Sequence, residues 1–353
     1  MKPVALPFGM RCLVKSPLIV CLIALLIAGV RAGAEPFRTN LSAPAGTTLT
    51  VDLNGGSIEV AVQDRREIRM EVERSARGRS PQRERELLSR SPLEFQHEGD
   101  EWKITTSTPK SDPELPDGAR PPLGGTFKIW VPGDCKLELK TLLGAVDVTG
   151  LKADVRVRVV SGSLRFSAIQ GAIRSETGSG SIQVRDCIGT NSFISRGGGV
   201  SVAGGAGELR VESGGGTLLI REFRGRVSAE TAAGGIRFDR VAGDIDGTTG
   251  TGRLVAEVPN PVPGLIHLEA TGGGGIAVNL PRGTGFDLDA ETSSGSVVVS
   301  IGAAKGPAGP VAIRREKING GGPEIKLRTG AGMIHVTATN TVPLTNSVPV
   351  AKH

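Results

Sequence analysis

The most regular feature of the sequence is a glycine followed, at the second and fourth positions after it, by apolar residues. This unit recurs every eighteen residues, at Gly144, Gly162, Gly180, Gly198, Gly216, Gly234 and Gly252. Its apolar side chains are Val146, Leu164, Ile182, Val200, Leu218, Ile236 and Leu254, then Val148, Phe166, Val184, Val202, Ile220, Phe238 and Ala256. Alternation with a period of two is typical of a strand with one buried face. The pattern therefore predicts one short β-strand in each repeat.

A second strand is predicted half a repeat away. Its apolar positions, interrupted only by Asn191, are Val155, Ile173, Leu209, Val227 and Ile245. The strand leads into a hydroxyl position that holds Thr177, Ser195, Ser213, Thr231 and Thr249. A small residue precedes the strand, namely Ala153, Gly171, Gly189, Gly207, Gly225 and Gly243. Glycine suits a corner because it adopts φ > 0 without a Cβ clash. Each repeat is therefore predicted to run strand, turn, strand, turn.

Repeats of equal length stack as parallel ladders, with a rise of about 4.8 Å for each coil. We therefore predict an all-β fold, a right-handed parallel β-solenoid with about eighteen residues per coil over residues 126–337. The right-handed sense follows from the strong preference of parallel crossovers. The hydroxyl positions have two interpretations, a ladder that satisfies polar groups at the corner or residues that only favour the turn. Pro- and Gly-rich loops at 259–264 and 302–310 are the expected contact sites.

Residues 35–125 are predicted to form a β-rich region that caps the stack, whose first coil would otherwise expose unpaired strand edges. A short helix is expected after Ser80, with Pro81 in its first turn. Strand-like segments are Thr48–Leu53, Gly56–Val60 and Ile68–Val72. Residues 338–353 are predicted to be a disordered tail.

Residues 1–34 have the features of a secretory signal. Three basic residues are followed by the apolar run Leu18–Val30 and then by Ala32-Gly33-Ala34, an A-x-A cleavage motif. The run has thirteen residues, fewer than the roughly twenty that a membrane-spanning helix needs. We therefore expect an extracytoplasmic protein, either periplasmic, at the cell surface or secreted, with no transmembrane segment after signal cleavage.

The charge balance argues against nucleic acid as a partner. The formal net charge is +6, but residues 1–34 hold four basic residues and no acidic ones, which leaves 38 basic against 36 acidic residues, or +2. The chain has no tyrosine and is 3% aromatic. Such a protein lacks both the positive field and the stacking platforms that nucleic-acid binders use.

Only Cys135 and Cys187 remain after the predicted cleavage. They are 52 residues apart, close to three coils. This separation corresponds to a rise of roughly 14 Å, which is beyond the reach of a disulfide. Cys187 also shares its phase with the apolar residues Leu151, Ile169, Phe223 and Val241. We therefore predict two free thiols, with Cys187 as a small buried residue.

A family resemblance is carried by Phe127–Gly133, which reads Phe-Lys-Ile-Trp-Val-Pro-Gly, by Leu137–Thr141, and by the Ser/Thr-x-x-Gly-x-aliphatic-x-aliphatic units that follow. Together they resemble the DUF4097 family of bacterial proteins, which are provisionally classed as adhesins. The resemblance covers about residues 46–337. It implies a right-handed β-helix-like fold outside the cytoplasm and a role in adhesion, and it brings no catalytic residues.

Parallel β-helices include polysaccharide-cleaving enzymes, and glycoside hydrolysis needs two carboxyl groups within roughly 5–10 Å. The candidates are Asp239, Asp244 and Asp246, which cluster in the sequence, and Asp186 with Glu208 on neighbouring coils. Carboxylates also gather on solvated faces. The sequence therefore assigns no catalytic residue.

Basic and acidic residues recur in phase on the predicted outer face. Arginine occupies one position at Arg156, Arg174 and Arg210, and glutamate the position two residues later at Glu176, Glu212 and Glu230. The arrangement is compatible with a mixed solvated face. This interpretation is favoured because exposed ion pairs contribute little to stability and need no special explanation. The alternative is a groove for an acidic glycan.

The sequence predicts no metal or cofactor site. Calcium-binding β-rolls repeat Gly-Gly-x-Gly-x-Asp, and Gly204–Gly207 resembles the start of this unit, but Leu209 occupies the ligand position. No zinc-like spacing is formed by the histidines, which are His97, His267, His335 and His353.

These patterns favour a non-enzymatic exported β-solenoid that acts as an adhesin or as a cell-envelope interaction protein. Its expected partners are a cell-surface glycan or an envelope protein. The alternative is a carbohydrate-active β-helix enzyme, a polysaccharide lyase or hydrolase. A third possibility is a scaffold in envelope-stress signalling.

Overall fold

The computed structural model describes residues 10–12, 34–76, 80–106, 123–260, 262, 264–301 and 311–339. Most of the predicted signal segment, part of the loop 259–264, the loop 302–310 and the tail from residue 340 lie outside the described residues. The chain divides into two compact units, Met1–Ser181 and Ile182–His353, which are described separately. None of the described residues forms a helix long and apolar enough to cross a membrane.

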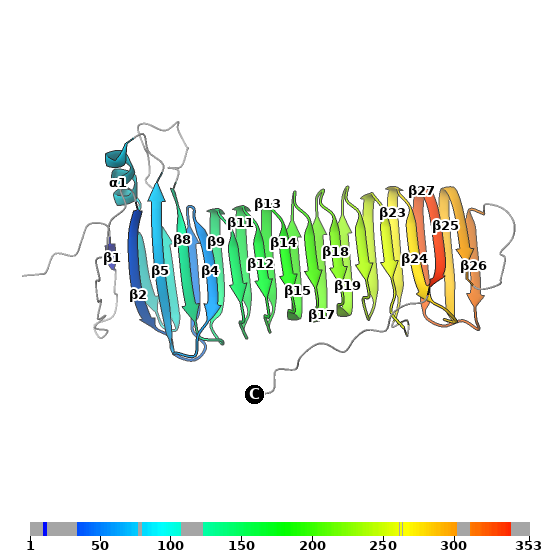
Figure 1. The fold of residues 1–353 in the computed structure, drawn as a ribbon, viewed down its shortest axis with the longest axis horizontal. Coiled ribbons are helices and arrows are strands. Elements are labelled where there is room, and N and C mark those ends of the chain that lie inside the picture. Colours follow the sequence, from blue (N-terminus) through cyan, green and yellow to red (C-terminus); the bar gives the residue numbers. More distant parts are fainter. Residues whose placement is uncertain are drawn as a thin grey trace, which may run out of the picture. The chain divides into compact units, whose positions relative to one another are not determined.

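Unit 1 is built from short strands and one helix (Figure 1). Its elements are β1 (Met10–Cys12), β2 (Ala34–Ser42), β3 (Thr48–Leu53), β4 (Ser57–Val62), β5 (Glu67–Ala76), α1 (Pro81–Arg90), β6 (Leu93–Glu98), β7 (Glu101–Thr106), β8 (Leu123–Val131), β9 (Lys136–Leu143), β10 (Val146–Thr149), β11 (Val155–Ser161), β12 (Leu164–Ser167) and β13 (Ile173–Ser179). In the part of the chain that the structure describes, α1 is the only helix. The all-β fold class is therefore confirmed.

Parallel pairing at the predicted repeat spacing organises the second half of unit 1. β9 pairs with β11 and β11 with β13, while β10 pairs with β12. The Cα partner of Val146 is Leu164 and that of Val155 is Ile173, each eighteen residues along the chain. All four side chains are buried. The predicted strands and their inward faces are thus confirmed, because burying one face of each strand excludes a one-residue slip.

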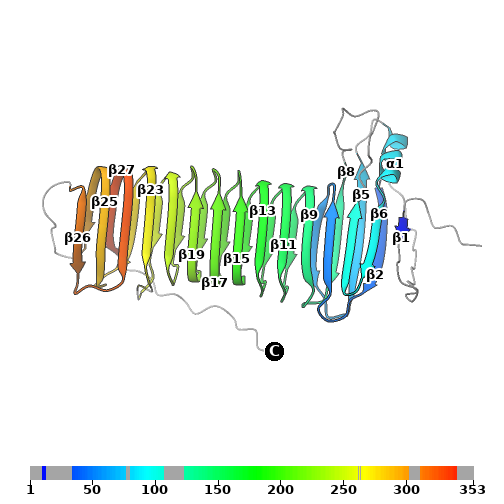
Figure 2. The same cartoon turned by 180° about the vertical axis from the view of Figure 1, so that it is seen from behind.

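The order of strands in space differs from their order along the chain. β3 pairs in parallel with β7 on one side and β9 on the other, and β4 lies in the same way between β8 and β10. Antiparallel pairs β2–β5, β5–β8 and β6–β7, with the parallel pair β1–β6, complete the sheet of this unit. Figure 2 shows the unit from behind. The pairing therefore places residues 48–62 inside the parallel stack.

Helix α1 begins where the sequence predicts. Ser80 is its N-cap, and the Ser80 hydroxyl accepts a hydrogen bond of 3.2 Å from the amide of Arg83. Pro81 occupies the first turn, where its missing N–H has no intrahelical partner to lose. Leu87 and Leu88 are buried in a cluster with Ala76.

Unit 2 is also built from a stack of this type (Figure 1). Its strands are β14 (Ile182–Arg185), β15 (Ile188–Ser195), β16 (Val200–Ala203), β17 (Ala206–Ser213), β18 (Leu218–Arg221), β19 (Arg224–Thr231), β20 (Ile236–Asp239), β21 (Ile245–Thr251), β22 (Leu254–Glu257), β23 (Ile266–Gly273), β24 (Ile276–Pro281), β25 (Phe286–Ser300), β26 (Ile313–Ile318) and β27 (Glu324–Thr339). Parallel partners are again eighteen residues apart, as in Val200 with Leu218 and Leu209 with Val227. Asn191 is buried and in register with Leu209, so the polar residue in the apolar series also faces inward.

The later strands of unit 2 also leave the sequence order. β27 pairs in parallel with β23 and β24 through its two halves, and with the long strand β25 on its other side. β26 pairs antiparallel with β25 and covers part of that edge. The last described strand is therefore enclosed by three strands that precede it in the chain, with β23 and β24 on one side and β25 on the other.

The first corner of each coil is the turn just before its short strand. At this corner, close backbone approach explains four of the glycines better than a positive φ does. Gly162, Gly216, Gly234 and Gly252 lie outside the left-handed region. A Cβ added to each of them would collide with the carbonyl oxygen of the corner glycine one coil earlier. The expected reason, a positive φ, therefore does not apply to these four glycines. It is confirmed at the other corner positions that hold Gly144, Gly180, Gly189, Gly207, Gly225 and Gly243, with φ between 116° and 153°.

A left-handed position that the sequence did not reveal follows the short strand of each coil. In unit 1 it holds Gly150 and Ala168, with φ of 81° and 54°. In unit 2 it holds Asp186, Gly204, Glu222 and Arg240, with φ between 51° and 74°. Non-glycine residues are uncommon in this region, so composition gave no signal for the turn.

Candidate functional site

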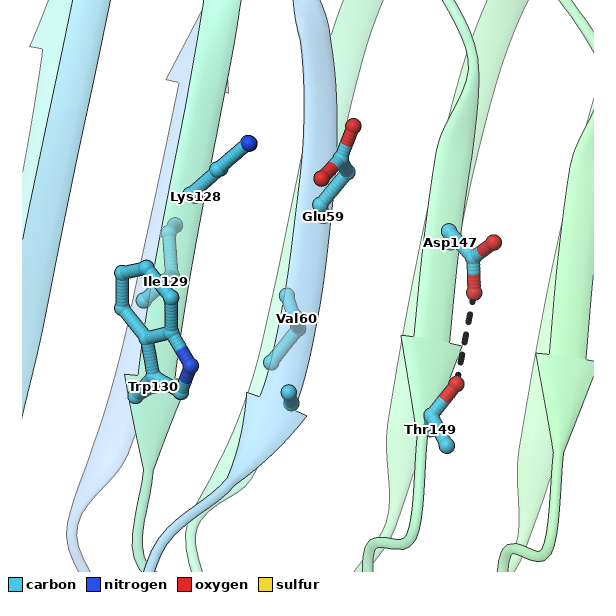
Figure 3. Close-up of a pocket in the computed structure, with 8 residues that line it drawn as sticks. Glu59, Val60, Lys128, Ile129, Trp130, Asp147 and Thr149 are labelled. Atoms are coloured by element: carbon cyan, nitrogen blue, oxygen red, sulfur yellow. Dashed lines mark hydrogen bonds between the residues drawn. The ribbon is translucent and has the colours of Figure 1, made fainter.

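A groove on the outer face of unit 1 is the main candidate site (Figure 3). It lies where β8, β4 and β10 run side by side, and it has a volume of about 270 Å³. The residues that line it are Glu59, Val60, Ala61, Lys128, Ile129, Trp130, Asp147 and Thr149. Val60 and Ile129 are buried and form the floor between strands.

Strand alternation places the other six side chains outward. Because Phe127, Ile129 and Val131 fill the interior, Lys128 and Trp130 between them face out. The parallel register then forms two rows across the strands. Trp130, Ala61 and Thr149 form one row, and Lys128, Glu59 and Asp147 form the other.

The hollow is centred on Ala61. This residue has the smallest side chain of its row, and its neighbours on the two adjacent strands are Trp130 and Thr149. The Trp130 side chain is half-buried, so part of the indole remains accessible beside the alanine. Figure 3 shows the indole on β8 next to the strand that carries Val60. The groove therefore has an aromatic wall on one side and a hydroxyl on the other.

Ion pairs hold the borders of the groove. On the β5 side, the Arg69 guanidinium lies 5.0 Å from the centroid of the Trp130 ring and 2.6 Å from Glu71. The hydrogen bond from Arg69 lowers the pKa of Glu71. On the far side, Asp147 lies 3.2 Å from Arg165 and accepts a hydrogen bond of 3.4 Å from the Thr149 hydroxyl. The Asp147 carboxylate is therefore positioned by two neighbours and can accept hydrogen bonds.

In unit 2, Asp239, Asp244 and Asp246, the acidic cluster considered in the sequence, each contact a different basic side chain. The Asp239 carboxylate is 2.9 Å from Arg240, and that of Asp244 is 3.2 Å from Arg226. Asp246 lies 3.0 Å from the Nδ1 atom of His267. Each of these carboxylates therefore contacts a basic side chain, and the contacts do not bring two of them together as the pair that glycoside cleavage uses.

Asp186 and Glu208 occupy different elements of unit 2. Asp186 is in the left-handed turn after β14, whereas Glu208 lies outward on β17. The register of Glu208 pairs it with Thr190 and Arg226. The strand pairing therefore does not align these two carboxylates.

The basic and acidic rows form local pairs within each unit. In unit 1, Arg156 is in register with Arg174 and lies 2.8 Å from Glu138 on the preceding strand. In unit 2, Arg210 pairs with Glu212 along the same strand at 2.5 Å. These contacts match a mixed, solvated face.

Neither Cys135 nor Cys187 forms a disulfide, as predicted. Both are buried, which the sequence predicted for Cys187 alone. Burial raises the pKa of the Cys135 thiol to about 12, and the negative charge of Asp134 acts in the same direction. A thiol with so high a pKa is protonated at neutral pH and is a poor nucleophile. Cys135 is therefore a packing residue.

No group of three or more His, Cys, Asp or Glu side chains suited to a metal ion occurs among the described residues. His97 stacks on Trp102 with ring centroids 4.2 Å apart, and His267 contacts Asp246. His335 is exposed on β27, and His353 lies outside the described residues.

Two solved structures are similar to this chain. One is a protein of Clostridium sporogenes provisionally assigned to cell adhesion, with 10% identity and a TM-score of 0.26, aligned over 86% of this chain and 100% of its own. The other is a provisionally assigned adhesin of Bacteroides fragilis, with 11% identity and a TM-score of 0.34, aligned over 88% and 100%. At these TM-scores no argument rests on either likeness. No known protein family and no curated protein sequence matches the chain.

Proposed function

We propose that this protein is a non-enzymatic, extracytoplasmic binding protein that acts in adhesion or in contacts within the cell envelope. Its fold in this proposal is a right-handed parallel β-solenoid of about eighteen residues per coil. The predicted secretory signal and the resemblance of Phe127–Thr141 to the DUF4097 family support an exported adhesin.

One observation carries the proposal, namely the open groove around Trp130 in unit 1. The groove lies on the outer face of the strands, where a large ligand such as a polymer chain has access. An exposed aromatic ring beside a few polar groups is the composition of a binding site. The Asp147 carboxylate is engaged by Arg165 and Thr149, so it suits hydrogen bonding better than proton transfer.

A carbohydrate-active enzyme is the second candidate. It is favoured by one feature, the register pairing of Glu59 with Asp147 beside Trp130 in the same groove. Two carboxylates on adjacent strands meet the spacing requirement of glycoside hydrolysis in principle. The ion pair of Asp147 with Arg165 opposes this role, because it already engages one of the two carboxylates.

The test combines export, binding and catalysis. The full chain, fused at its C-terminus to a phosphatase that is active only outside the cytoplasm, is expected to give phosphatase activity in a bacterial host. The purified protein is expected to sediment with isolated bacterial envelopes and to release no reducing sugar from polysaccharides. An inactive fusion, or protein that stays in the supernatant, would contradict the proposal. Sugar release that Glu59→Gln abolishes would establish the enzyme instead.

A further inference from the structure

We propose that the groove over Ala61 is a subsite for a neutral pyranose residue of a glycan, with Trp130 as its aromatic platform. This inference rests on the proposed binding function and names the ligand class and the residues that recognise it. The occupant follows from the shape, the aromatic surface and the charges of the groove.

The shape of the groove fits one sugar ring. Neighbouring strands are about 4.8 Å apart, so Trp130 and Thr149 flank Ala61 across roughly 10 Å. A pyranose ring above the methyl group of Ala61 would therefore lie between the indole and the Thr149 hydroxyl. Any larger side chain at this position would fill the space.

The indole of Trp130 supplies the apolar contact. β8 has β5 on one side and β4 on the other, and Arg69 of β5 lies over the ring. The ring is half-buried, and Trp130 is in register with Ala61 on β4. An aromatic face carries partial negative charge and attracts the polarised C–H groups on one side of a pyranose. Arg69 also fixes the ring, which reduces the entropy lost on binding.

Polar groups beside the hollow match the hydroxyl groups of a sugar. Glu59 and Asp147 accept hydrogen bonds, Lys128 donates them, and the Thr149 hydroxyl does either. These four side chains lie on three adjacent strands. Thr149 is in the same row as Ala61 and Trp130, and the other three form the next outward row, two residues earlier along each strand.

Charge selects the class of sugar. The lining contains two carboxylates, Glu59 and Asp147, and one ammonium group, Lys128. Arg165 pairs with Asp147, which leaves Lys128 opposite Glu59 and no further cation in the lining. A uronic or sialic acid would bring a third carboxylate without a partner, and like charges at this range repel. A neutral sugar avoids that repulsion. The ligand proposed for this groove therefore differs from the acidic glycan that the sequence suggested for the row of Arg156, Arg174 and Arg210.

The experiment uses the full mature chain on an array of neutral oligosaccharides, ending in glucose, galactose, mannose or N-acetylglucosamine, and of sialylated and uronic acid oligosaccharides. We expect binding to neutral members. The best of them is then titrated while tryptophan fluorescence is recorded. The chain has two tryptophans, and Trp102 is buried with its indole N–H bonded to the Ser42 carbonyl, so the signal reports on Trp130.

Two variants test the site in different ways. Trp130→Ala removes the platform and is expected to weaken binding by about tenfold or more. Ala61→Leu keeps the tryptophan but fills the hollow, and it should have a similar effect. Leu219→Ala, which removes a half-buried outward leucine on β18 in unit 2, is the matched control and should bind as the wild type does. Circular dichroism and thermal unfolding identify any variant that fails to fold.

The outcomes separate this inference from the proposed function. Unchanged affinity in a folded Trp130→Ala or Ala61→Leu protein, binding to acidic glycans alone, or binding to no glycan on the array would overturn the subsite. Sedimentation with envelopes would persist in each of those cases if the binding function is correct and its partner is a protein. Sugar release with intact groove binding would refute the non-enzymatic function and leave the subsite standing.

Discussion

Single glycines at the first corner determine how closely successive coils approach. In unit 2, Gly216 packs so tightly on Gly198 that no side chain fits between them, while the adjacent Gly215 faces open space. These two neighbours therefore separate the steric demand of the corner from the general effect of glycine on the unfolded chain.

We expect Gly216→Ala to destabilise the protein by about 1–3 kcal/mol or more, because its Cβ would displace the Gly198 backbone. Gly215→Ala, the matched control, should be neutral or stabilising by up to about 1 kcal/mol, because it only restricts the unfolded chain. Urea unfolding monitored by circular dichroism measures both. Equal effects for the two variants would show that close packing at Gly216 is not limiting.

At the scale of the elements, the buried hydroxyls decide between the two interpretations that the sequence left open. The Thr231 hydroxyl donates to the carbonyl of Gly216 at 3.2 Å and accepts from the amide of Gly234 at 3.2 Å. Thr249 and Ser213 donate in the same way to Gly234 and Gly198. The hydroxyls thus join adjacent coils through backbone groups of the corner, and they satisfy polar atoms that water does not reach.

Replacement of Thr231 by valine tests this role. Thr231→Val keeps the shape but leaves a buried carbonyl and a buried amide without partners, so we expect a loss of about 1–3 kcal/mol. Thr231→Ser retains the hydroxyl and should recover most of that stability. Unfolding by guanidinium chloride gives the comparison. A valine variant as stable as the serine variant would mean that the residue serves only the turn.

At the scale of the whole molecule, each unit encloses, between strands distant in sequence, one or two strands that lie towards one end of its described residues. In unit 1 these are β3 and β4, and in unit 2 it is β27. The β3–β9 pairing joins Thr48 to Lys136, and contacts so distant in sequence form slowly because a long loop must close first. This arrangement leaves other segments, such as the antiparallel β26, to cover the edges.

An ionic network joins β26, β25 and β27 at the edge of unit 2. The Asp289 carboxylate lies 2.9 Å from Arg315 and 2.5 Å from Arg328. The hydrogen bond from Arg328, followed by that from Arg315, lowers the pKa of Asp289 in the folded protein. Because the folded pKa is depressed, the stabilisation is present above the unfolded pKa of about 3.9 and disappears as the pH falls through the folded value.

We therefore expect Asp289→Asn to reduce stability by about 1 kcal/mol at pH 7 and to lose this effect progressively below about pH 4. Thermal unfolding of both proteins between pH 2.5 and 7 measures the difference. Asp246→Asn is the control, since its carboxylate is exposed and lies 3.0 Å from His267, with no arginine within ion-pair distance among the described residues. A difference that stays constant over this pH range would show that charge pairing is not its source.

The sequence by itself determined the local structure of this protein. Period-two alternation identified strands such as β11 and β12 and the residues that they bury, because one face of each strand must leave water. Ser80 and Pro81 located the start of α1, and the repeat phase of Cys187 gave its burial. Each of these features depends on interactions within one repeat or one helical turn.

Only the tertiary structure decided which strands lie next to one another. Every parallel strand edge offers the same amides and carbonyls, so the repeat could not show that Ile58 lies between Phe127 and Val146, or that Ile334 separates Ile276 from Val297. The groove depends on that order, since Ala61 and Trp130 are 69 residues apart in the chain and in register in the sheet. Alternation assigned both side chains to the outer face, and the long-range pairing brought them together.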